Sequence, residues 1–379
     1  MHTVAESSTV GRTTTANVLR AIPERTRRRR YLPALAMFGI DYLGVFLGTA
    51  GACLAPTWIG RMIFAVVAAF SIGGLFIIGH DAAHSSFVPS RRGNRILARL
   101  AFLPAYVPLA SWRYNHNVRH HRFLRVRGED VVWQPWSYEE YWAAPRWQRA
   151  YYRLLRTPLG LPFYWTVHNW LPRFLLADRS RLRSEWKQFQ VDRACVAAYA
   201  FFVFGAMFAL GRAVEHAAWS WPRPSSAVET LIWALVVPYL MWSFLIGFVD
   251  FVQHTHPRSV WFGSIEEWDY VTANLRSSTH IVLPLHLNGL WHHILEHAAH
   301  HVDPRVPLYE LSRAQEALET AYPDDVLVER LTPAFLWRLW KTCRLYDFTN
   351  RQWLDYDGTP TAPSQRSAPR FSGCAVTMP

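Results

Sequence analysis

Four stretches of this 379-residue chain are apolar and nearly long enough to cross a lipid bilayer as helices: residues 32–56, 62–79, 194–211 and 228–252. Backbone groups inside a bilayer find no water to bond, so segments of this kind must be helical. Charged residues make up only 18% of the chain, against about 25% in soluble domains. The sequence therefore predicts an all-α integral membrane protein with four transmembrane helices. Residues 31–350 are expected to form one membrane domain.

The remaining segments are less apolar. Asp41 interrupts the first stretch, and because a carboxylate is costly deep in a bilayer, we expect it near the interface or facing another helix. Residues 96–109 and 159–176 contain proline, and we expect interfacial or re-entrant segments there. The two ends, residues 1–30 and 351–379, are polar and rich in Ser, Thr, Pro or Arg, and we expect them to be disordered.

Arginine is distributed unevenly around the four stretches. The run "RTRRRR" precedes the first stretch and many arginines follow the second, whereas the other two connections contain few. Cytoplasmic segments of membrane proteins carry this excess. We therefore expect both termini and residues 80–193 and 253–379 on the cytoplasmic face, as a helical cap on a multi-pass protein of a bacterial inner membrane. The formal net charge of +12 suits an anionic membrane surface or an acidic partner, and the apolar runs argue against nucleic acid.

Three histidine clusters, "HDAAH", "HNVRHH" and "HAAHH", lie on this predicted cytoplasmic side. Helical residues three or four apart share one face, whereas adjacent residues point about 100° apart, so each adjacent pair can reach two different ions. Eight imidazoles are too many for one tetrahedral zinc and fit two metals. Imidazole suits Fe, Zn, Cu and Ni alike, so the residues alone do not choose the metal. The eight candidate ligands are His80, His84, His116, His120, His121, His297, His300 and His301.

A ninth candidate, His254, follows the fourth apolar stretch on the same side. Asp250 lies one helical turn earlier, where it could hold a ring N–H of His254. His256 is the competing ninth ligand, but its place before Pro257 disfavours the helical conformation. Glu296 and Asp81 are further carboxylates expected to support metal-bound histidines. His292 and His293 are less favoured as ligands, and we expect ordinary surface or interfacial roles for His2, His168, His216, His280 and His286.

The three clusters, in this order around four membrane spans, resemble those of the integral-membrane fatty acid desaturases. The resemblance runs from "GHDAAHSSFVPSRRGNR" through "WRYNHNVRHHRF", "DVVWQPW" and "FVQHTHP" to "EHAAHHVDPRVPLYEL". "QHTHP" and "HHVDPRVPLY" look most like the acyl-lipid delta-12 (omega-6) branch and its bacterial relatives. One departure is that the second cluster has three residues before its double histidine, where many members have two.

The resemblance implies an O2-dependent enzyme in which a non-haem di-iron centre introduces a cis double bond into an acyl chain. The eight clustered histidines would be the iron ligands, with His254 as the ninth. The substrate would be an acyl-lipid or an acyl chain on a carrier, and the electron donor a ferredoxin or a b5-type cytochrome.

Two other functions remain open at this point. A di-iron membrane hydroxylase, acting on alkane, carotenoid or acyl chains, would share the histidine clusters. A metal transporter is less favoured, because transporters place liganding groups near the bilayer midplane, whereas here the clusters are expected beyond the ends of the spans.

Overall fold

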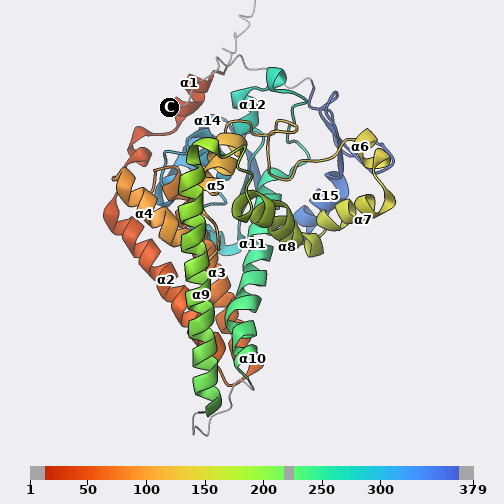
Figure 1. The fold of residues 1–379 in the computed structure, drawn as a ribbon. Coiled ribbons are helices and arrows are strands. Elements are labelled where there is room, and N and C mark those ends of the chain that lie inside the picture. Colours follow the sequence, from red (N-terminus) through yellow and green to blue (C-terminus); the bar gives the residue numbers. More distant parts are fainter. Residues whose placement is uncertain (1–12, 217–225, 367–379) are drawn as a thin grey trace, which may run out of the picture.

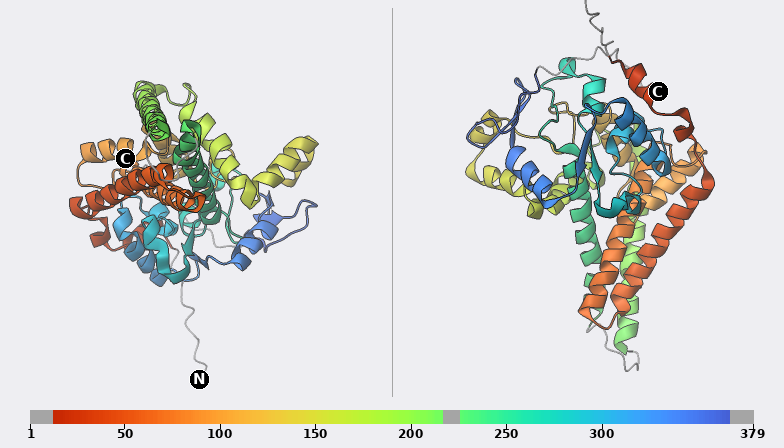
Figure 2. Two further views of the ribbon diagram at one scale, coloured as in Figure 1. Left: turned by 90° about the horizontal axis from the view of Figure 1, so that it is seen from below. Right: turned by 180° about the vertical axis from the view of Figure 1, so that it is seen from behind.

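The four predicted spans are four long helical segments in the computed structural model, which describes residues 13–216 and 226–366. They stand side by side as a bundle (Figures 1 and 2), and each is long and apolar enough to cross a membrane. Their bounds are α2 (Tyr31–Leu54), α3 (Trp58–Ala83), α9 (Trp186–His216) and a continuous helical run of α10 (Ala227–Leu231), η6 (Ile232–Val236) and α11 (Val237–His254). The prediction of four spans is confirmed.

Glycines let α2 pack closely against α3. A Cβ atom on Gly48 would lie 2.5 Å from the backbone nitrogen of Ala68, so only glycine fits at this crossing. Small residues four apart, here Gly44 and Gly48, are a common means of close helix approach in membranes. At the far end of the bundle, Arg61 of α3 forms an ion pair with Glu229 of α10. These contacts fix the helix that carries the first histidine cluster.

The buried Asp41 is paired. Its Oδ2 atom lies 2.6 Å from Nε2 of His292, in the segment just before α13. This contact gives a physical reason for a carboxylate within α2, since a paired charge costs less to bury than a lone one. It also ties α2 to the segment that leads into the third histidine cluster.

Residues 84–182 and 255–366 gather at one end of the bundle, and we call them the cap (Figure 1). The α2–α3 turn and α10 lie at the opposite end. The cap helices after α3 are α4 (Arg91–Phe102), α5 (Leu109–Arg113), η2 (Tyr114–His120), α6 (Tyr138–Ala143), α7 (Arg146–Leu155), η3 (Pro158–Gly160), α8 (Leu161–Phe163) and η4 (Tyr164–Leu175). After α11 they are η7 (Ile265–Glu267), α12 (Tyr270–Leu275), η8 (Pro284–Trp291), α13 (His297–Val302), η9 (Leu308–Glu310), α14 (Leu311–Ala321) and α15 (Pro333–Thr342). The short η5 (Arg183–Glu185) leads from the cap into α9.

Four short strands add to this helical fold. β1 (Thr279–Val282) pairs in parallel with β2 (Leu327–Arg330), with Thr279 opposite Leu327. β3 (Leu345–Asp347) pairs antiparallel with β4 (Gln352–Leu354), with Leu345 opposite Leu354. The chain remains mostly helical, as predicted.

Parts of both ends expected to be disordered have defined structure. Residues 13–30 contain α1 (Thr15–Ala21) and η1 (Glu24–Arg27), and Val18 is fully buried in the core. Residues 351–366 include β4, where the indole N–H of Trp353 donates to the carbonyl of His256 at 2.9 Å. The expectation of disorder was therefore wrong for these residues, because tertiary contacts supply the burial that composition does not reveal. Residues 1–12, with His2, and 367–379 lie outside the described residues.

The two proline-containing segments do not add spans among the described residues. Residues 96–109 fall on α4 and α5, and residues 159–176 on η3, α8 and η4. Both belong to the cap rather than to the bundle (Figure 1). Their interfacial or re-entrant placement stays a prediction.

Candidate metal centre

The second histidine cluster lies on a π-helix, η2, rather than on an α-helix. The backbone N–H of His121 donates to the carbonyl of His116 at 2.9 Å, five residues earlier. The wider turn brings the Nε2 atoms of His116 and His121 to 3.0 Å from each other, and His120 faces elsewhere. The extra residue before the double histidine is accommodated by this turn, and π-helical turns of this kind recur at functional sites.

The nine histidines converge into two groups where the cap meets the bundle. In each group, every residue offers a ring nitrogen within 4.8 Å of those of the others. The adjacent pairs His120–His121 and His300–His301 are divided between the groups, as predicted for neighbouring residues on a helix. Group one is His80, His84, His116, His121 and His300, and group two is His120, His254, His297 and His301.

The ring nitrogens within each group are too crowded for hydrogen bonding alone to satisfy them. Nε2 of His121 lies 3.0 Å from that of His116 and 3.1 Å from that of His300. Nε2 of His297 lies 2.9 Å from that of His254 and 3.0 Å from that of His301. A neutral imidazole carries a single N–H, so it cannot donate to two neighbours. Converging lone pairs of this kind suit a cation held between them.

Burial favours the neutral form of six of these imidazoles, all outside the spans. It lowers the pKa of His84 to about 3, with smaller contributions from the nearby His120 and Arg113. For the other group members outside the spans, burial lowers the pKa well below the usual range: His116, His121, His297, His300 and His301. A metal ion binds the neutral ring, so the residues present fit two metal ions.

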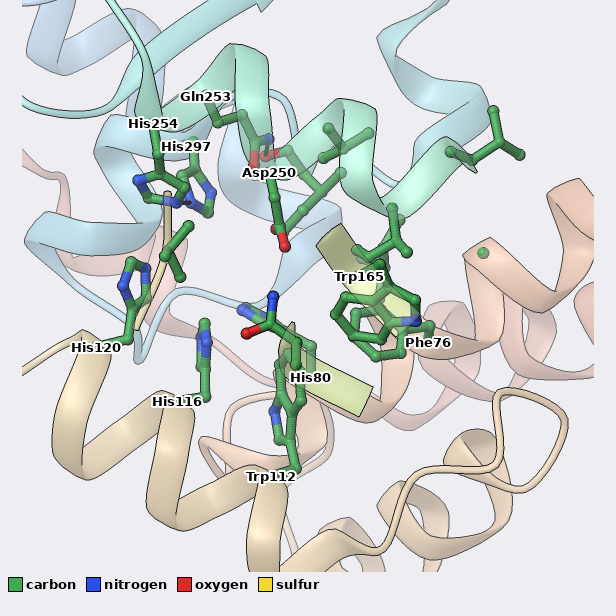
Figure 3. A pocket seen from close by; sticks show the side chains of 18 of the residues that line it. Phe76, His80, Trp112, His116, His120, Trp165, Asp250, Gln253, His254 and His297 are labelled. Carbon is green, nitrogen blue, oxygen red and sulfur yellow. Dashed lines mark hydrogen bonds between the residues drawn. The ribbon is translucent and has the colours of Figure 1, made fainter. Parts of the chain in front are cut away.

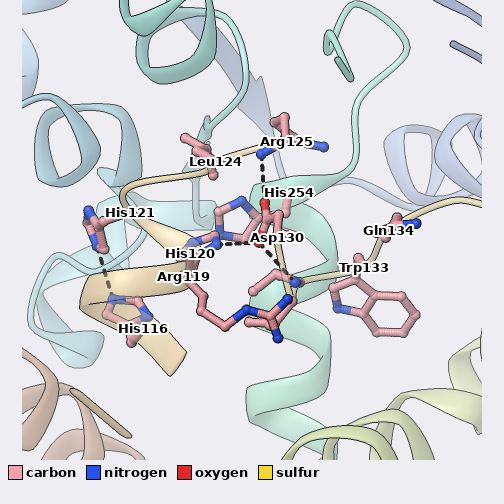
Figure 4. A network of polar contacts seen from close by, with 12 residues as sticks. His116, Arg119, His120, His121, Leu124, Arg125, Asp130, Trp133, Gln134 and His254 are labelled. Atoms are coloured by element: carbon pink, nitrogen blue, oxygen red, sulfur yellow. Dashed lines mark hydrogen bonds and ion pairs between the residues drawn. The ribbon is translucent and has the colours of Figure 1, made fainter. Parts of the chain in front are cut away.

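Asp130 orients His120, a role that the sequence analysis missed. Its Oδ1 atom accepts from Nδ1 of His120 at 2.8 Å and from the backbone N–H of Val132 at 3.1 Å, and its Oδ2 atom accepts from the backbone N–H of Arg125 at 2.8 Å (Figure 4). A carboxylate on the second ring nitrogen fixes the orientation of a metal-binding histidine. The only signal in the sequence was an aspartate ten residues after His120, within "DVVWQPW".

The three carboxylates predicted for this supporting role have other contacts. Asp250 does not hold His254, whose Nδ1 atom has no hydrogen-bond partner in residues 13–216 and 226–366. The Asp250 carboxylate points instead into a cavity (Figure 3). Glu296 accepts from Nδ1 of His293 at 3.0 Å, and Asp81 accepts from the hydroxyl of Ser86 at 2.7 Å. Closeness in sequence to a histidine therefore did not identify the supporting carboxylate. The carboxylate that holds His120 comes from Asp130, on a loop that folds back to it.

The remaining described histidines lie outside both groups. His256, the competing ninth ligand, contacts Glu329 at 3.0 Å. His292 and His293 contact Asp41 and Glu296. His168 and His280 contact Tyr151 at 3.1 Å and Glu319 at 2.5 Å. The side chains of His216 and His286 are outside the described part of the chain.

An apolar cavity between α3 and α11 reaches both groups (Figure 3). Histidines from each group form its polar end, and aromatic and aliphatic side chains form most of its wall. The polar end includes His80 and His116 of group one and His120, His254 and His297 of group two. The apolar wall includes Phe76, Ile77, Trp112, Trp165, Trp242, Ile246 and Val249. A long apolar molecule in this cavity would present one stretch of its length to both groups.

Comparison with known proteins agrees with this arrangement. The sequence model of the fatty acid desaturase family matches residues 56–333, which contain all nine histidines. The chain is 28% identical to an sn-1 oleoyl-lipid 12-desaturase of Synechocystis over 83% of this chain and 82% of that protein. An sn-1 oleoyl-lipid 12-desaturase of Anabaena variabilis is also 28% identical, over 87% and 89% of the two chains. A chloroplastic omega-6 fatty acid desaturase of Arabidopsis thaliana is 29% identical over 78% of this chain and 61% of its own length. The chain belongs to the fatty acid desaturase family.

Proposed function

We propose that this protein is an O2-dependent acyl-lipid desaturase that introduces a cis double bond into an acyl chain. The observation that carries the proposal is the meeting of nine histidines, eight of them buried and His84 half-buried, in two groups, with the end of one apolar cavity. The desaturases named above, which act on oleoyl-lipids or are omega-6 fatty acid desaturases, support the acyl-lipid class. The hydroxylase alternative is not favoured, because those relatives are all desaturases.

Group one would hold one iron ion and group two the other. Two iron ions, when bound there, supply the O2 activation that hydrogen removal from an unactivated methylene requires. The overall reaction removes one hydrogen from each of two adjacent carbons and forms the C=C bond. Those two hydrogens, two further protons and two electrons from a donor convert O2 to two molecules of water.

The protein's own side chains would position the acyl chain. Burying each methylene in an apolar cavity contributes about 0.8 kcal/mol, so the wall formed by Phe76, Trp165 and Trp242 can hold a chain without polar contacts. The same wall excludes bulk water from the histidine groups. His80 and His116 flank the cavity opposite His254 and His297, so the reacting carbons would lie between the groups (Figure 3).

The electron donor and the orientation are part of the proposal. A ferredoxin or a b5-type cytochrome would donate to the cap, and the net charge of +12 supports an acidic partner. The arginine distribution supports a cytoplasmic cap in a bacterial inner membrane, with both termini on that side.

Metal content and lipid analysis test the proposal. Protein purified in detergent should contain about two iron atoms per chain, because nine imidazoles form two groups. Expression in a host without this desaturase should add a double bond to its membrane acyl chains. His301→Ala should lose iron and activity together. The matched control is His280→Ala in the same cap, whose ring is paired with Glu319 and belongs to neither group, and it should keep both. One zinc per chain and no iron would contradict the proposal.

A further inference from the structure

A second pocket lies in the cap beside the apolar cavity, and its walls are aromatic and cationic. The loop after the second histidine cluster, α7 and η4 form it. The side chains that matter here are Trp133, Tyr151, Arg156, Tyr164, His168 and Arg173. The mechanism proposed above uses none of them.

The two arginines of this pocket have no acidic partner. In residues 13–216 and 226–366, no carboxylate oxygen lies within 4.0 Å of either guanidinium. Arg156 donates to the carbonyls of Trp133 at 3.2 Å and Cys343 at 3.4 Å. Nη1 of Arg173 donates to the carbonyl of Val131 at 2.5 Å and to Oδ1 of Asn169 at 2.7 Å, and Nη2 of Arg173 makes no hydrogen bond within the described residues. The pocket therefore holds two fixed positive charges and at least one free donor.

The one carboxylate in the pocket wall is already engaged. Both oxygens of Asp130 accept hydrogen bonds from His120 and from backbone N–H groups, as described above. The surroundings of His168 agree with a net positive pocket, since burial and then the nearby charge of Arg173 lower the pKa of its ring. A ligand that carries negative charge would offset this repulsion.

The pocket adjoins the apolar cavity. Val131 lines both, and Asn169, which lines the cavity, accepts from Arg173 of the pocket. A molecule could therefore place an anionic group in the pocket and an apolar chain in the cavity. The pocket and the cavity are separated by side chains that they share, among them Val131.

Exposed apolar side chains beside this pocket suit a position at the height of a membrane surface. Trp147 of α7 is 67% exposed, and Leu159 beyond α7 is 76% exposed. Phe163, Val167 and Leu171 continue this exposed face along α8 and η4. These elements lie at the base of the cap beside α11 (Figure 1). Tryptophan and long apolar side chains are enriched where a protein meets the lipid headgroups.

We propose that this pocket binds the phosphate diester of a phospholipid substrate, with Arg173 as the principal contact, while one acyl chain of that lipid enters the apolar cavity. This inference rests on the proposed function and names the substrate class. Arginine recognises phosphate with paired, charge-assisted hydrogen bonds. Tyr151 and His168, 3.1 Å apart, offer further polar groups to the same headgroup. Arg173 acts in binding and takes no part in hydrogen removal.

The test compares headgroups in vesicles made of a saturated galactolipid. Dioleoyl-phosphatidylglycerol is the charged substrate and a dioleoyl galactolipid is the neutral one, each at varied mole fraction. Loss of a charge-assisted hydrogen bond predicts a rise of roughly tenfold or more in the KM of Arg173→Gln for the phospholipid, with kcat maintained. Arg173→Lys should recover part of this loss, and the galactolipid KM should not change. Arg146→Gln, which removes the same charge from the exposed start of α7, is the control and should match the wild type.

A second measurement does not depend on catalysis. Wild-type protein in detergent should retain more phospholipid phosphorus per chain than Arg173→Gln, at equal unfolding temperature and iron content. If the wild type retains this phospholipid but desaturates no lipid, the proposed function fails and the pocket assignment stands. Equal losses on both lipids, or no change on either, would overturn the assignment. A third arm offers an oleoyl thioester on a phosphopantetheine carrier protein: dependence on Arg173 in that arm alone would assign the phosphate to the carrier and reject a phospholipid.

Discussion

His254 and His256 are two residues apart, and the fold gives them different tasks. His254 is the last residue of α11 and joins group two, whereas His256 follows the helix and contacts Glu329. The two rings are similarly buried, so burial does not separate them. What separates them is direction, because the chain leaves the helix at Thr255 in an extended conformation.

We expect His254→Ala to abolish desaturation and to release about one iron per chain, since group two would keep only three rings. His256→Ala should retain most activity and both ions, because its ring nitrogens contact Glu329 and the backbone N–H of Arg258 and belong to neither histidine group. Lipid analysis and iron content on membranes with matched protein levels decide between them. An inactive His256→Ala beside an active His254→Ala would show that the assignment is reversed.

Asp130 is the carboxylate that we expect to matter most for metal binding among those described. Asp130→Asn keeps the shape of the side chain and removes the negative charge that holds the His120 ring. The expected result is a loss of roughly 10–100-fold in iron affinity or activity, as for other carboxylates that support a metal-bound histidine. Glu129→Gln is the neighbouring control, because Glu129 lies 3.9 Å from Arg119 and pairs with no histidine among the residues that the structure describes. Unchanged iron affinity in Asp130→Asn would mean that the ring is held by packing.

At the scale of elements, the second and third histidine clusters reach the same arrangement with different helices. In α13, His297 and His301 are four residues apart on an α-helix and His300 turns to the other group. In η2, His116 and His121 are five residues apart on a π-helix and His120 turns to the other group. One extra residue is therefore absorbed as one wider turn, and the ring positions at the metal groups are preserved.

Deleting Val118, which is 43% exposed on η2, should convert the π-helix to an α-helix. The cluster would then have two residues before its double histidine, as in α13, so we expect both irons and activity within several-fold of the wild type. Deleting Ala298 from the α-helix α13 should remove both, because no wide turn is present there to take up the change. Iron content of the two purified variants is the measurement. Loss of iron from both would show that the π-helix itself is required.

For the whole molecule, two helical hairpins return the chain to the same end of the bundle (Figure 2). All nine histidines gather at that end. Reporter fusions after residues 90 and 310 should therefore give a cytoplasmic signal, and a fusion after residue 220 should give an external one. This expectation rests on the arginine distribution. An external signal at 310 would contradict the four-span topology.

The sequence by itself determined the spans, the clusters and the nine histidines, because each follows from a local property: the length of an apolar run or the spacing of residues on a helix. It did not reveal Asp130, whose carboxylate reaches His120 only because a loop folds back over ten residues. The sequence also did not predict that residues 13–30 and 351–366 have defined structure, since the burial of Val18 and Trp353 depends on partners far along the chain. The sequence did not predict the apolar cavity or the second pocket either. The wall of the apolar cavity combines α3, α11 and cap segments, and that of the second pocket combines a cap loop, α7 and η4. Only packing in three dimensions decides which side chains from separate segments share one space.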